Sequence, residues 1–353
     1  MAKERNDLEA QVMEQLSTVI EPELHRDLVT LNMIRDLKID GDDVSFTIML
    51  TTPACPLKDV METQSREAVL RVEGINSATI NFDADVPANS RIMGQLNLSL
   101  KSMVAVSSGK GGVGKSTVAV NVAVALAQSG ASVGLLDADI LGPNIPMMMG
   151  VDRIPPPVNQ RLVPASAHGV KLMSMGFLVE ADQPLVWRGP MLHSAIRQFF
   201  TDVDWGPLDY MVVDLPPGTG DAQLSLAQSV PLTGAVIVTQ PQEVALGDAL
   251  RGLAMFEQLQ VPIVGVVENM SGELFGQGGG EKLAGQRGVP FLGSVPMETE
   301  VRTSGDGGTP IVVSHPDSAA ATALTAIAQE VAARLSVITI EQDQNIIPLT
   351  TID

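Results

Sequence analysis

The sequence predicts an α/β protein in which a doubly wound, mostly parallel sheet follows a small α/β domain. Two observations support this fold class. After Ser102, short apolar segments alternate with helical ones, as parallel strands joined by crossover helices do. A separate series of helix and strand patterns precedes them. We expect a small domain at residues 1–86, a linker at 87–101, a P-loop ATPase domain at 102–338 and an acidic tail at 339–353.

The small domain is predicted from local patterns. Apolar residues at helical spacing, such as Leu8, Val12 and Leu16, indicate an amphipathic helix, and strict alternation indicates a strand. Cys55 lies in the segment TTPACP, just before the second helix. The elements in order are a helix over 5–20, a turn at 41–43, a strand over 44–50, a helix over 58–72 and a strand over 78–82.

The larger domain is predicted from apolar runs that are too short and too continuous for amphipathic helices. Such runs are typical of strands buried on both faces of a parallel sheet. The predicted strands are Met103–Val106, Val133–Leu136, Tyr210–Val213, Ala235–Thr239, Ile263–Val267 and a short segment near Phe291.

Charge and cysteine content narrow the function classes. The chain of 353 residues has 22 basic and 41 acidic side chains, a formal net charge of −19. Such a surface repels nucleic acid and anionic membranes, so we expect neither as a partner. The N-terminus lacks the apolar core of a signal peptide. The single cysteine excludes an internal disulfide and fits a reducing compartment. We expect a cytoplasmic protein.

The segment GKGGVGKS matches the P-loop pattern at every fixed position. An apolar strand precedes it and a helix follows it, so its backbone N–H groups and the helix N-terminus form a cradle for phosphates. Lys115 is expected to bridge the β- and γ-phosphates of ATP, and the Ser116 hydroxyl to hold Mg²⁺. The nucleotide-binding residues are expected to be Gly109, Lys110, Gly111, Gly112, Val113, Gly114, Lys115, Ser116 and Thr117.

Two other strands end in aspartate. Asp137 and Asp139 follow the second strand, and Asp214 ends the third in an apolar run of the Walker B type. Strand ends in such a sheet meet at one edge. Asp214 and Asp137 are therefore predicted to support Mg²⁺, while a carboxylate here is also placed to orient the attacking water. For Asp137 and Asp139 the alternative is a pair of turn or helix-capping aspartates.

The second lysine of the loop, Lys110, makes the segment resemble the deviant Walker A motif of MinD/ParA-type ATPases. That resemblance implies a homodimer in which Lys110 contacts the nucleotide of the partner subunit, and it makes Asp139 the water-positioning residue. Lys110, Lys115 and Asp139 are thus the expected catalytic residues. The same resemblance implies that Asn269 and Pro296, each placed after a strand, contact the adenine base; both are otherwise ordinary turn residues.

The motifs VSSGKGGVGKST, LLDADILGPNIP, VVDLPPGTGD, VVENMS, GGGEKL and SGDGGTPIV together resemble the Mrp/ApbC family of ATP-dependent iron–sulfur cluster carriers. The N-terminal segments EPEL and TTPACP are similar to the small domain fused to many of its members. The resemblance implies ATP hydrolysis in iron–sulfur cluster assembly or carriage, and partners that are cluster scaffolds or recipients.

The chain departs from that family in its cysteines. Members that carry a cluster usually have a C-x-x-C pair between the VVENMS and GGGEKL motifs, and here that interval is short and has none. Two alternatives follow: a cluster held weakly through Cys55 with outside ligands, or a cluster-free, nucleotide-switched regulatory or positioning ATPase of the ParA/MinD kind. Cys55 is either a small buried hydrophobe or a thiol whose pKa the following helix lowers.

Overall fold

The computed structural model describes residues 2–90, 92, 98–140, 142–177 and 189–344. The chain divides into two compact units, residues 1–86 and 87–353. The last nine residues of the expected acidic tail, 345–353, and part of the expected linker lie outside the described residues.

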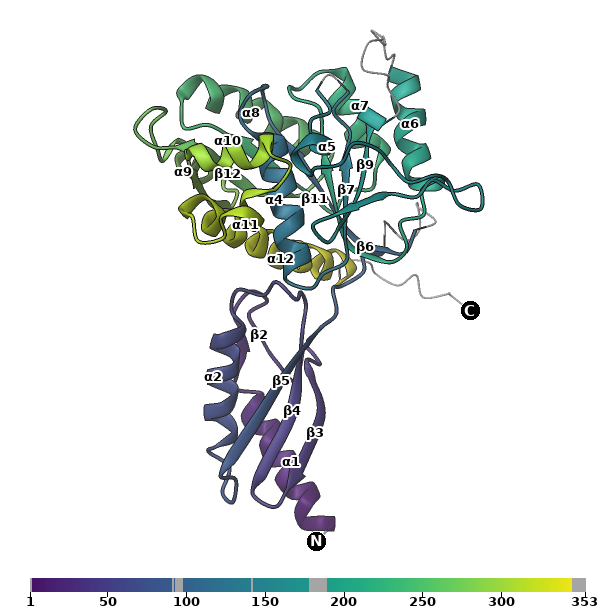
Figure 1. Cartoon of the computed structure of the whole chain (residues 1–353). Helices are drawn as coiled ribbons and strands as arrows, with labels where there is room; N and C mark the ends of the chain where they lie inside the picture. The colour runs from purple at the N-terminus through teal and green to yellow at the C-terminus, as the bar shows by residue number, and fades with distance from the viewer. Residues whose placement is uncertain (1, 91, 93–97, 141, 178–188, 345–353) are drawn as a thin grey trace, which may run out of the picture. The chain divides into compact units, whose positions relative to one another are not determined.

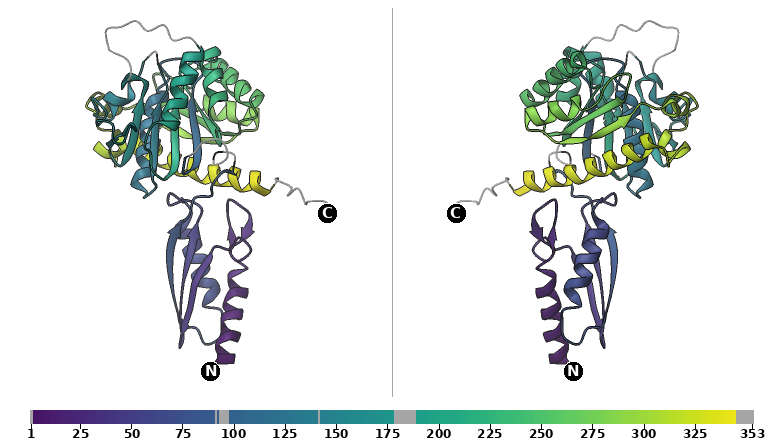
Figure 2. Two further views of the ribbon diagram at one scale, coloured as in Figure 1. Left: turned by 90° about the vertical axis from the view of Figure 1, so that its right-hand side faces the viewer. Right: turned by 90° about the vertical axis from the view of Figure 1, so that its left-hand side faces the viewer.

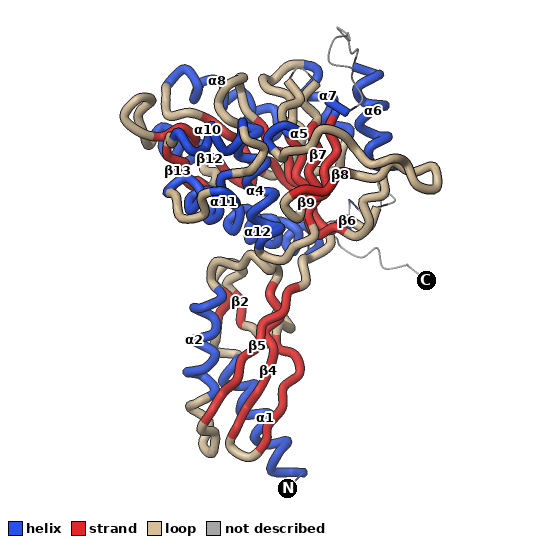
Figure 3. Tube along the Cα trace, in the orientation of Figure 1, coloured by secondary structure: helices blue, strands red, loops and turns tan. Residues whose placement is uncertain are grey.

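The first unit is a small α/β fold built on a three-stranded sheet (Figure 3). β4 pairs antiparallel with β3 and parallel with β5. Alternate residues of β4 point inward, and Phe46 and Ile48 are buried there with Leu16 and Met61. The elements are α1 (Ala2–Leu16), β1 (Ile20–Glu21), β2 (Arg26–Asp27), β3 (Ile34–Asp40), β4 (Asp43–Leu50), α2 (Lys58–Val69) and β5 (Ser77–Ala84).

Several expected bounds in this unit were wrong. The first helix ends at Leu16, and Val19 lies beyond it, before the short strand β1. The second helix ends at Val69, before the expected residue 72. β3 was not predicted from the sequence, because its residues IRDLKID do not alternate cleanly and it has an irregular register with β4.

The second unit is an eight-stranded sheet with helices on both faces (Figures 1 and 2). The strand order is β13-β12-β11-β6-β10-β7-β9-β8, and every neighbouring pair is parallel except β8 and β9. The strands are β6 (Leu100–Ser107), β7 (Val133–Asp137), β8 (Ala165–Ala167), β9 (Val170–Ser174), β10 (Leu208–Asp214), β11 (Gly234–Thr239), β12 (Ile263–Ser271) and β13 (Phe291–Pro296).

All six expected strands are present, and β8 and β9 were not expected. Both are short, and the turn between them uses His168 and Gly169 at positive φ. β6 begins at Leu100, inside the expected linker.

The helices that cover this sheet form two groups. α12 packs on α4 and α11, whereas α6 packs on α7 and α8 packs on α9. The chain passes from β6 to β7 in one direction and from β10 to β11 in the other, so right-handed crossovers put α4 and α7 on opposite faces. The helices are α4 (Lys115–Gln128), α5 (Ile145–Met148), α6 (Gly189–Thr201), α7 (Asp221–Ser229), α8 (Glu243–Gln258), α9 (Gly279–Arg287), α10 (Thr299–Asp306), α11 (Ile311–Ser314) and α12 (Ala319–Gln344).

The core of this sheet contains Trp205, Tyr210, Phe199 and Phe256, all buried. α12 continues six residues into the segment expected as an acidic tail. By length and composition it is the one described helix that could cross a membrane, but half of its apolar window is buried inside the protein. Its packing on α4 and β13 accounts for these buried apolar residues, as in the core helix of a globular domain.

Candidate nucleotide-binding site

The candidate site lies at the carboxyl ends of β6, β7 and β10, where the strand order reverses. Ligands of doubly wound sheets bind at such a switch point. The register of the parallel strands pairs Asp214 with Asp137 directly, and Asp214 with Val106 on its other side. The two aspartates meet because neighbouring strands end level with each other, next to the loop that follows β6.

The loop after β6 depends on its glycines. Gly112 and Gly114 have φ of 77° and 84°, in the left-handed region where L side chains are strained. A Cβ on Gly114 would lie 2.1 Å from Nδ2 of Asn269, and one on Gly109 would lie 2.1 Å from the carbonyl of Asp248 in α8. The loop therefore lies in direct contact with both β12 and α8.

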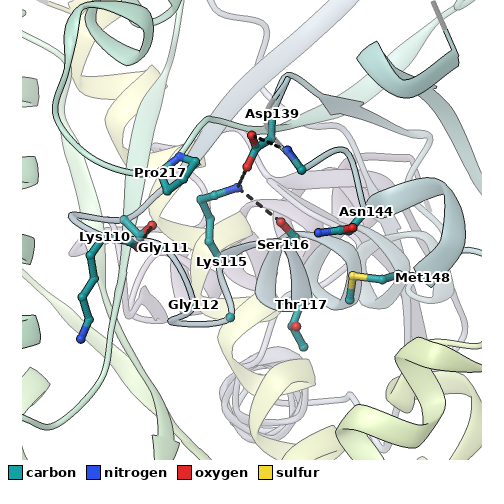
Figure 4. A pocket seen from close by; sticks show the side chains of 13 residues that line it. Lys110, Gly111, Gly112, Lys115, Ser116, Thr117, Asp139, Asn144, Met148 and Pro217 are labelled. Atoms are coloured by element: carbon teal, nitrogen blue, oxygen red, sulfur yellow. Dashed lines mark hydrogen bonds and ion pairs between the residues drawn. The ribbon is translucent and has the colours of Figure 1, made fainter. Parts of the chain in front are cut away.

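Lys115, at the start of α4, extends toward the Asp139 carboxylate and the Ser116 hydroxyl (Figure 4). Nζ of Lys115 lies 2.7 Å from Oδ1 of Asp214 and 3.8 Å from Oδ2 of Asp139. The Ser116 hydroxyl donates to Oδ2 of Asp214 at 2.6 Å. Lysine, serine and two carboxylates from three elements thus form one connected cluster.

Burial shapes the charge of this cluster. Asp137 and Asp214 are fully buried and Lys115 is 6% exposed. Burial, helped by the nearby charge of Asp214, raises the pKa of Asp137 to about 8, and a hydrogen bond from the Ser174 hydroxyl (2.8 Å) opposes that rise. Burial also raises the pKa of Asp214, and Lys115 opposes it.

Asp139 is held beside this cluster by one bond from its backbone and one to its side chain. Its N–H donates to Oδ1 of Asp137 at 3.1 Å, and its Oδ1 accepts from the N–H of Gly142 at 3.3 Å. Asp139 also lines a cavity of about 370 Å³ together with Lys115, Ser116 and Pro217. The structure therefore brings all three expected aspartates together around Lys115.

Lys110 behaves differently from Lys115. It lines the same cavity, but its side chain extends away from Lys115 and Asp139 (Figure 4). Its backbone carbonyl accepts a hydrogen bond from the Ser108 hydroxyl at 2.9 Å. The loop conformation thus directs the second lysine away from the centre of the cluster that surrounds the first.

A second cavity, of about 470 Å³, shares Thr117, Asn144 and Met148 with the first. Asn269 and Pro296 both line it. The sequence placed each of them after a strand, and this was wrong: Asn269 lies within β12 and Pro296 is the last residue of β13. The strand ends were predicted too early because the last residues of both strands are polar or proline and give no apolar signal. Nδ2 of Asn269 donates to the carbonyl of Val113 at 2.9 Å.

Sequence reasoning missed Ser174 and Gln223. Ser174 ends β9 and binds Asp137, and Gln223 in α7 donates to the Ser107 hydroxyl at the end of β6. The signal for Ser174 was available in the sequence, because VKLMS is a short apolar run that follows a turn glycine.

Cys55 does not have the activated thiol that a position before a helix suggested. Its side chain is half-buried, three residues before α2 begins. Burial raises the pKa of the Cys55 thiol to about 11, the Leu57 N–H opposes that rise, and the carboxylates of Glu23 and Glu21 add to it. Desolvation and two negative charges outweigh the helix N-terminus. Among the described residues, no three His, Cys, Asp or Glu side chains form a group that could hold a metal ion.

Comparison with known families gives two matches that divide the chain. Residues 99–332 match the family described as NUBPL iron-transfer P-loop NTPase. Residues 9–82 match the family described as iron-sulfur cluster assembly protein. Each match falls within one of the two structural units.

Curated relatives span both units. An iron-sulfur cluster carrier protein of Synechocystis is 53% identical over 342 residues, covering 92% of this chain and 97% of the relative. A protein of the same description from Deinococcus radiodurans is 50% identical over 339 residues, covering 93% and 95%.

Solved structures resemble the second unit. A nucleotide-binding protein of Archaeoglobus fulgidus in complex with ADP has a TM-score of 0.54 and 37% identity, covering 62% of this chain and 90% of its own. The cell division ATPase MinD of Pyrococcus furiosus has a TM-score of 0.54 and 25% identity, covering 65% and 97%. The expected MinD/ParA-like P-loop fold is confirmed.

Proposed function

Because this chain belongs to the NUBPL-type iron-transfer P-loop NTPases, we propose that it binds and hydrolyses ATP as a homodimer that assembles or transfers iron–sulfur clusters in the cytoplasm. The observation that carries the proposal is the contact of Lys115 and Ser116 with Asp214 at the switch point of the sheet. The name of the Synechocystis relative supports the cargo.

Lys115 neutralises the β- and γ-phosphates of ATP, and the backbone N–H groups of residues 109–117 surround them. The cavity that Asn269 and Pro296 line shares some of its lining residues with the phosphate cavity. It is placed to receive the adenine base, with Asn269 held against the loop by its bond to Val113.

Mg²⁺ is implied by the family, and the oxygen donors present fit it. Mg²⁺ prefers one or two carboxylates together with waters and phosphate oxygens. The Ser116 hydroxyl and the Asp214 carboxylate lie 2.6 Å apart and would hold the ion, with Asp137 beside them. When bound, the ion neutralises charge on the phosphates of ATP.

Asp139 orients the water that attacks the γ-phosphate. Asp137 accepts from its backbone N–H, and the N–H of Gly142 donates to its carboxylate, so the side chain is held in place. Catalysis of phosphoryl transfer depends mainly on such positioning. Lys110 acts on the nucleotide of the partner subunit, and its direction away from its own cluster supports that role. Lys110, Lys115 and Asp139 are the proposed catalytic residues.

The cluster is cargo rather than a resident group. A bridging [4Fe–4S] cluster takes four thiolates, and a dimer of this chain has only two cysteines, each with a raised pKa. The residues present do not fit such a site. We propose that scaffold or recipient proteins supply the remaining ligands and that the N-terminal domain recruits them.

Anaerobic reconstitution with iron and sulfide tests this function. Bound iron per dimer and the visible spectrum are compared for the wild type and Cys55→Ser, each with and without an apo-recipient protein and ATP. ATP-dependent delivery of a cluster to the recipient supports the proposal. ATP turnover without iron binding or delivery in any arm contradicts it.

The second candidate is a cluster-free, nucleotide-switched regulatory or positioning ATPase. The lack of a second cysteine favours it. ATP-dependent, salt-sensitive co-sedimentation with DNA or anionic vesicles would support this candidate. The net charge of −19 disfavours binding to either of these polyanions.

A further inference from the structure

Glu268, in β12, is a buried carboxylate that the site described so far does not use. Its side chain is 1% exposed. Oε1 accepts from the N–H of Gly278 at 3.0 Å and from the Ser294 hydroxyl at 2.9 Å, and Oε2 accepts from the N–H of Gly280 at 2.7 Å. Among the described residues, no lysine or arginine pairs with it. Two backbone N–H groups and one hydroxyl are therefore the donors that offset the desolvation of this carboxyl group.

These bonds join three segments at a point where the sheet is irregular. Glu268 pairs with Ser294 and Ser271 pairs with Pro296, so β12 advances three residues while β13 advances two. The extra residue lies at Asn269–Met270, and Met270 has a φ of 59°, which L residues rarely adopt. Such a bulge re-aims the side chains that it contains.

The re-aimed side chains face the nucleotide site. Asn269 donates to Val113 of the P-loop, and Asn269 and Met270 both line the 470 Å³ cavity. Glu268 is the residue before them, and it lines not this cavity but a neighbouring one of about 550 Å³, together with Ser294 and Glu281. Successive residues of a strand face opposite ways, so a slip of one residue would turn Asn269 away from the loop.

We propose that Glu268 is a positioning residue for nucleotide binding: it fixes the register of β12 beside the bulge and so keeps Asn269 on the P-loop. The glycines allow this, because a Cβ on Gly280 would lie 2.9 Å from that of Glu268. Through the same carboxylate, the segment 278–280 is tied to the nucleotide loop. This inference rests on the ATP site proposed above.

The test uses the full chain with Glu268→Gln, Asn269→Ala and the double variant. Glutamine keeps the volume of the side chain but presents N–H groups to an N–H donor, so packing is separated from hydrogen bonding. We expect each single variant to weaken ATP binding by about 10-fold, and the double variant to be no more than about 2-fold weaker than either, because both act on one contact. Wild-type affinity in Glu268→Gln, or additive losses of about 100-fold, would overturn the proposal.

Hydrogen exchange of the ligand-free protein gives a readout that does not depend on ATP. Glu268→Gln should speed exchange at residues 109–116 as well as in β12, and a change confined to β12 and α9 would overturn the proposal. A wild type that fails to bind ATP would instead reject the proposed function, while the exchange experiment still decides the role of Glu268.

Two further variants complete the design. Glu281→Gln alters an exposed carboxylate of the same 550 Å³ cavity, and we expect no change in affinity or exchange. If Glu268→Gln does not fold, Ser294→Ala removes one donor alone, and we expect about a 3-fold loss of ATP affinity in the same direction. An unchanged affinity in Ser294→Ala would then count against the proposal.

Discussion

The nucleotide site and the segment around Cys55 each bury a group whose reactivity depends on its charge. Lys115 forms ion pairs with two carboxylates, whose charge is opposite to its own. The Cys55 thiol instead lies near Glu21 and Glu23, whose negative charge has the same sign as that of a thiolate. Burial alone does not make a group reactive. Neighbouring charges of opposite sign favour the ionised form of a buried group, whereas charges of the same sign add to the effect of burial.

The largest expected effect is at Lys115. Lys115→Ala removes the cation that pairs with Asp214 and is proposed to bind the phosphates, so ATP turnover should fall by at least about 1000-fold. Turnover and nucleotide affinity are measured on the purified chain. Lys282→Ala, which alters an exposed lysine paired with Glu243, is the matched control and should change neither by more than about 2-fold. Full turnover in Lys115→Ala would refute the site assignment.

The second largest effect is expected in the rate at which the Cys55 thiol is alkylated. With its pKa raised from 9.0 to about 11, the thiolate fraction at pH 8 is lower by about 100-fold. Alkylation of the folded chain should therefore be slower by about that factor than alkylation of the unfolded chain. The folded rate should rise about tenfold with each unit of pH below 11. Equal rates in both states would show that the thiol is not desolvated.

Lys110 contrasts with Lys115 within the nucleotide site, because no described ion pair joins Lys110 to the carboxylates of its own subunit. Lys110→Ala should lower the rate of hydrolysis by about 30-fold and leave the affinity for ATP within about 3-fold, because the lost contact is made to the partner subunit. Mixing Lys110→Ala with Asp139→Ala subunits should restore part of the activity if each supplies what the other lacks. A parallel loss of binding would place Lys110 in its own subunit's site.

The smallest expected effect is at Glu23. Glu23→Gln removes one of the two negative charges that raise the pKa of Cys55, and alkylation below that pKa should become faster by about 3-fold. The wild type under the same conditions is the reference. A slower reaction would mean that packing, not charge, controls the thiol.

The sequence predicted the P-loop fold and the residues around Lys115 because strand ends in a parallel sheet converge whatever the loops do. Asp214 and Asp137 could be placed together from their positions at strand ends alone. Ser174 was missed because the short apolar run VKLMS that ends in it was not recognised as a strand. Glu268 could not be predicted, since its role comes from a bulge that has no local signature. The sequence left two readings of Cys55 open, because neither its burial nor its carboxylate neighbours, which are more than thirty residues away, can be read from the local segment.

One contact described above has a mechanical consequence. Gly109 touches the backbone of α8 so closely that even a methyl group does not fit between them. Protein interiors are close-packed and scarcely compressible, so the loop has no slack against this helix. Any displacement of the loop toward this helix would therefore have to move α8 as well. The exposed side chains of α8, including Val244 and Arg251, would then report at the surface which nucleotide is bound.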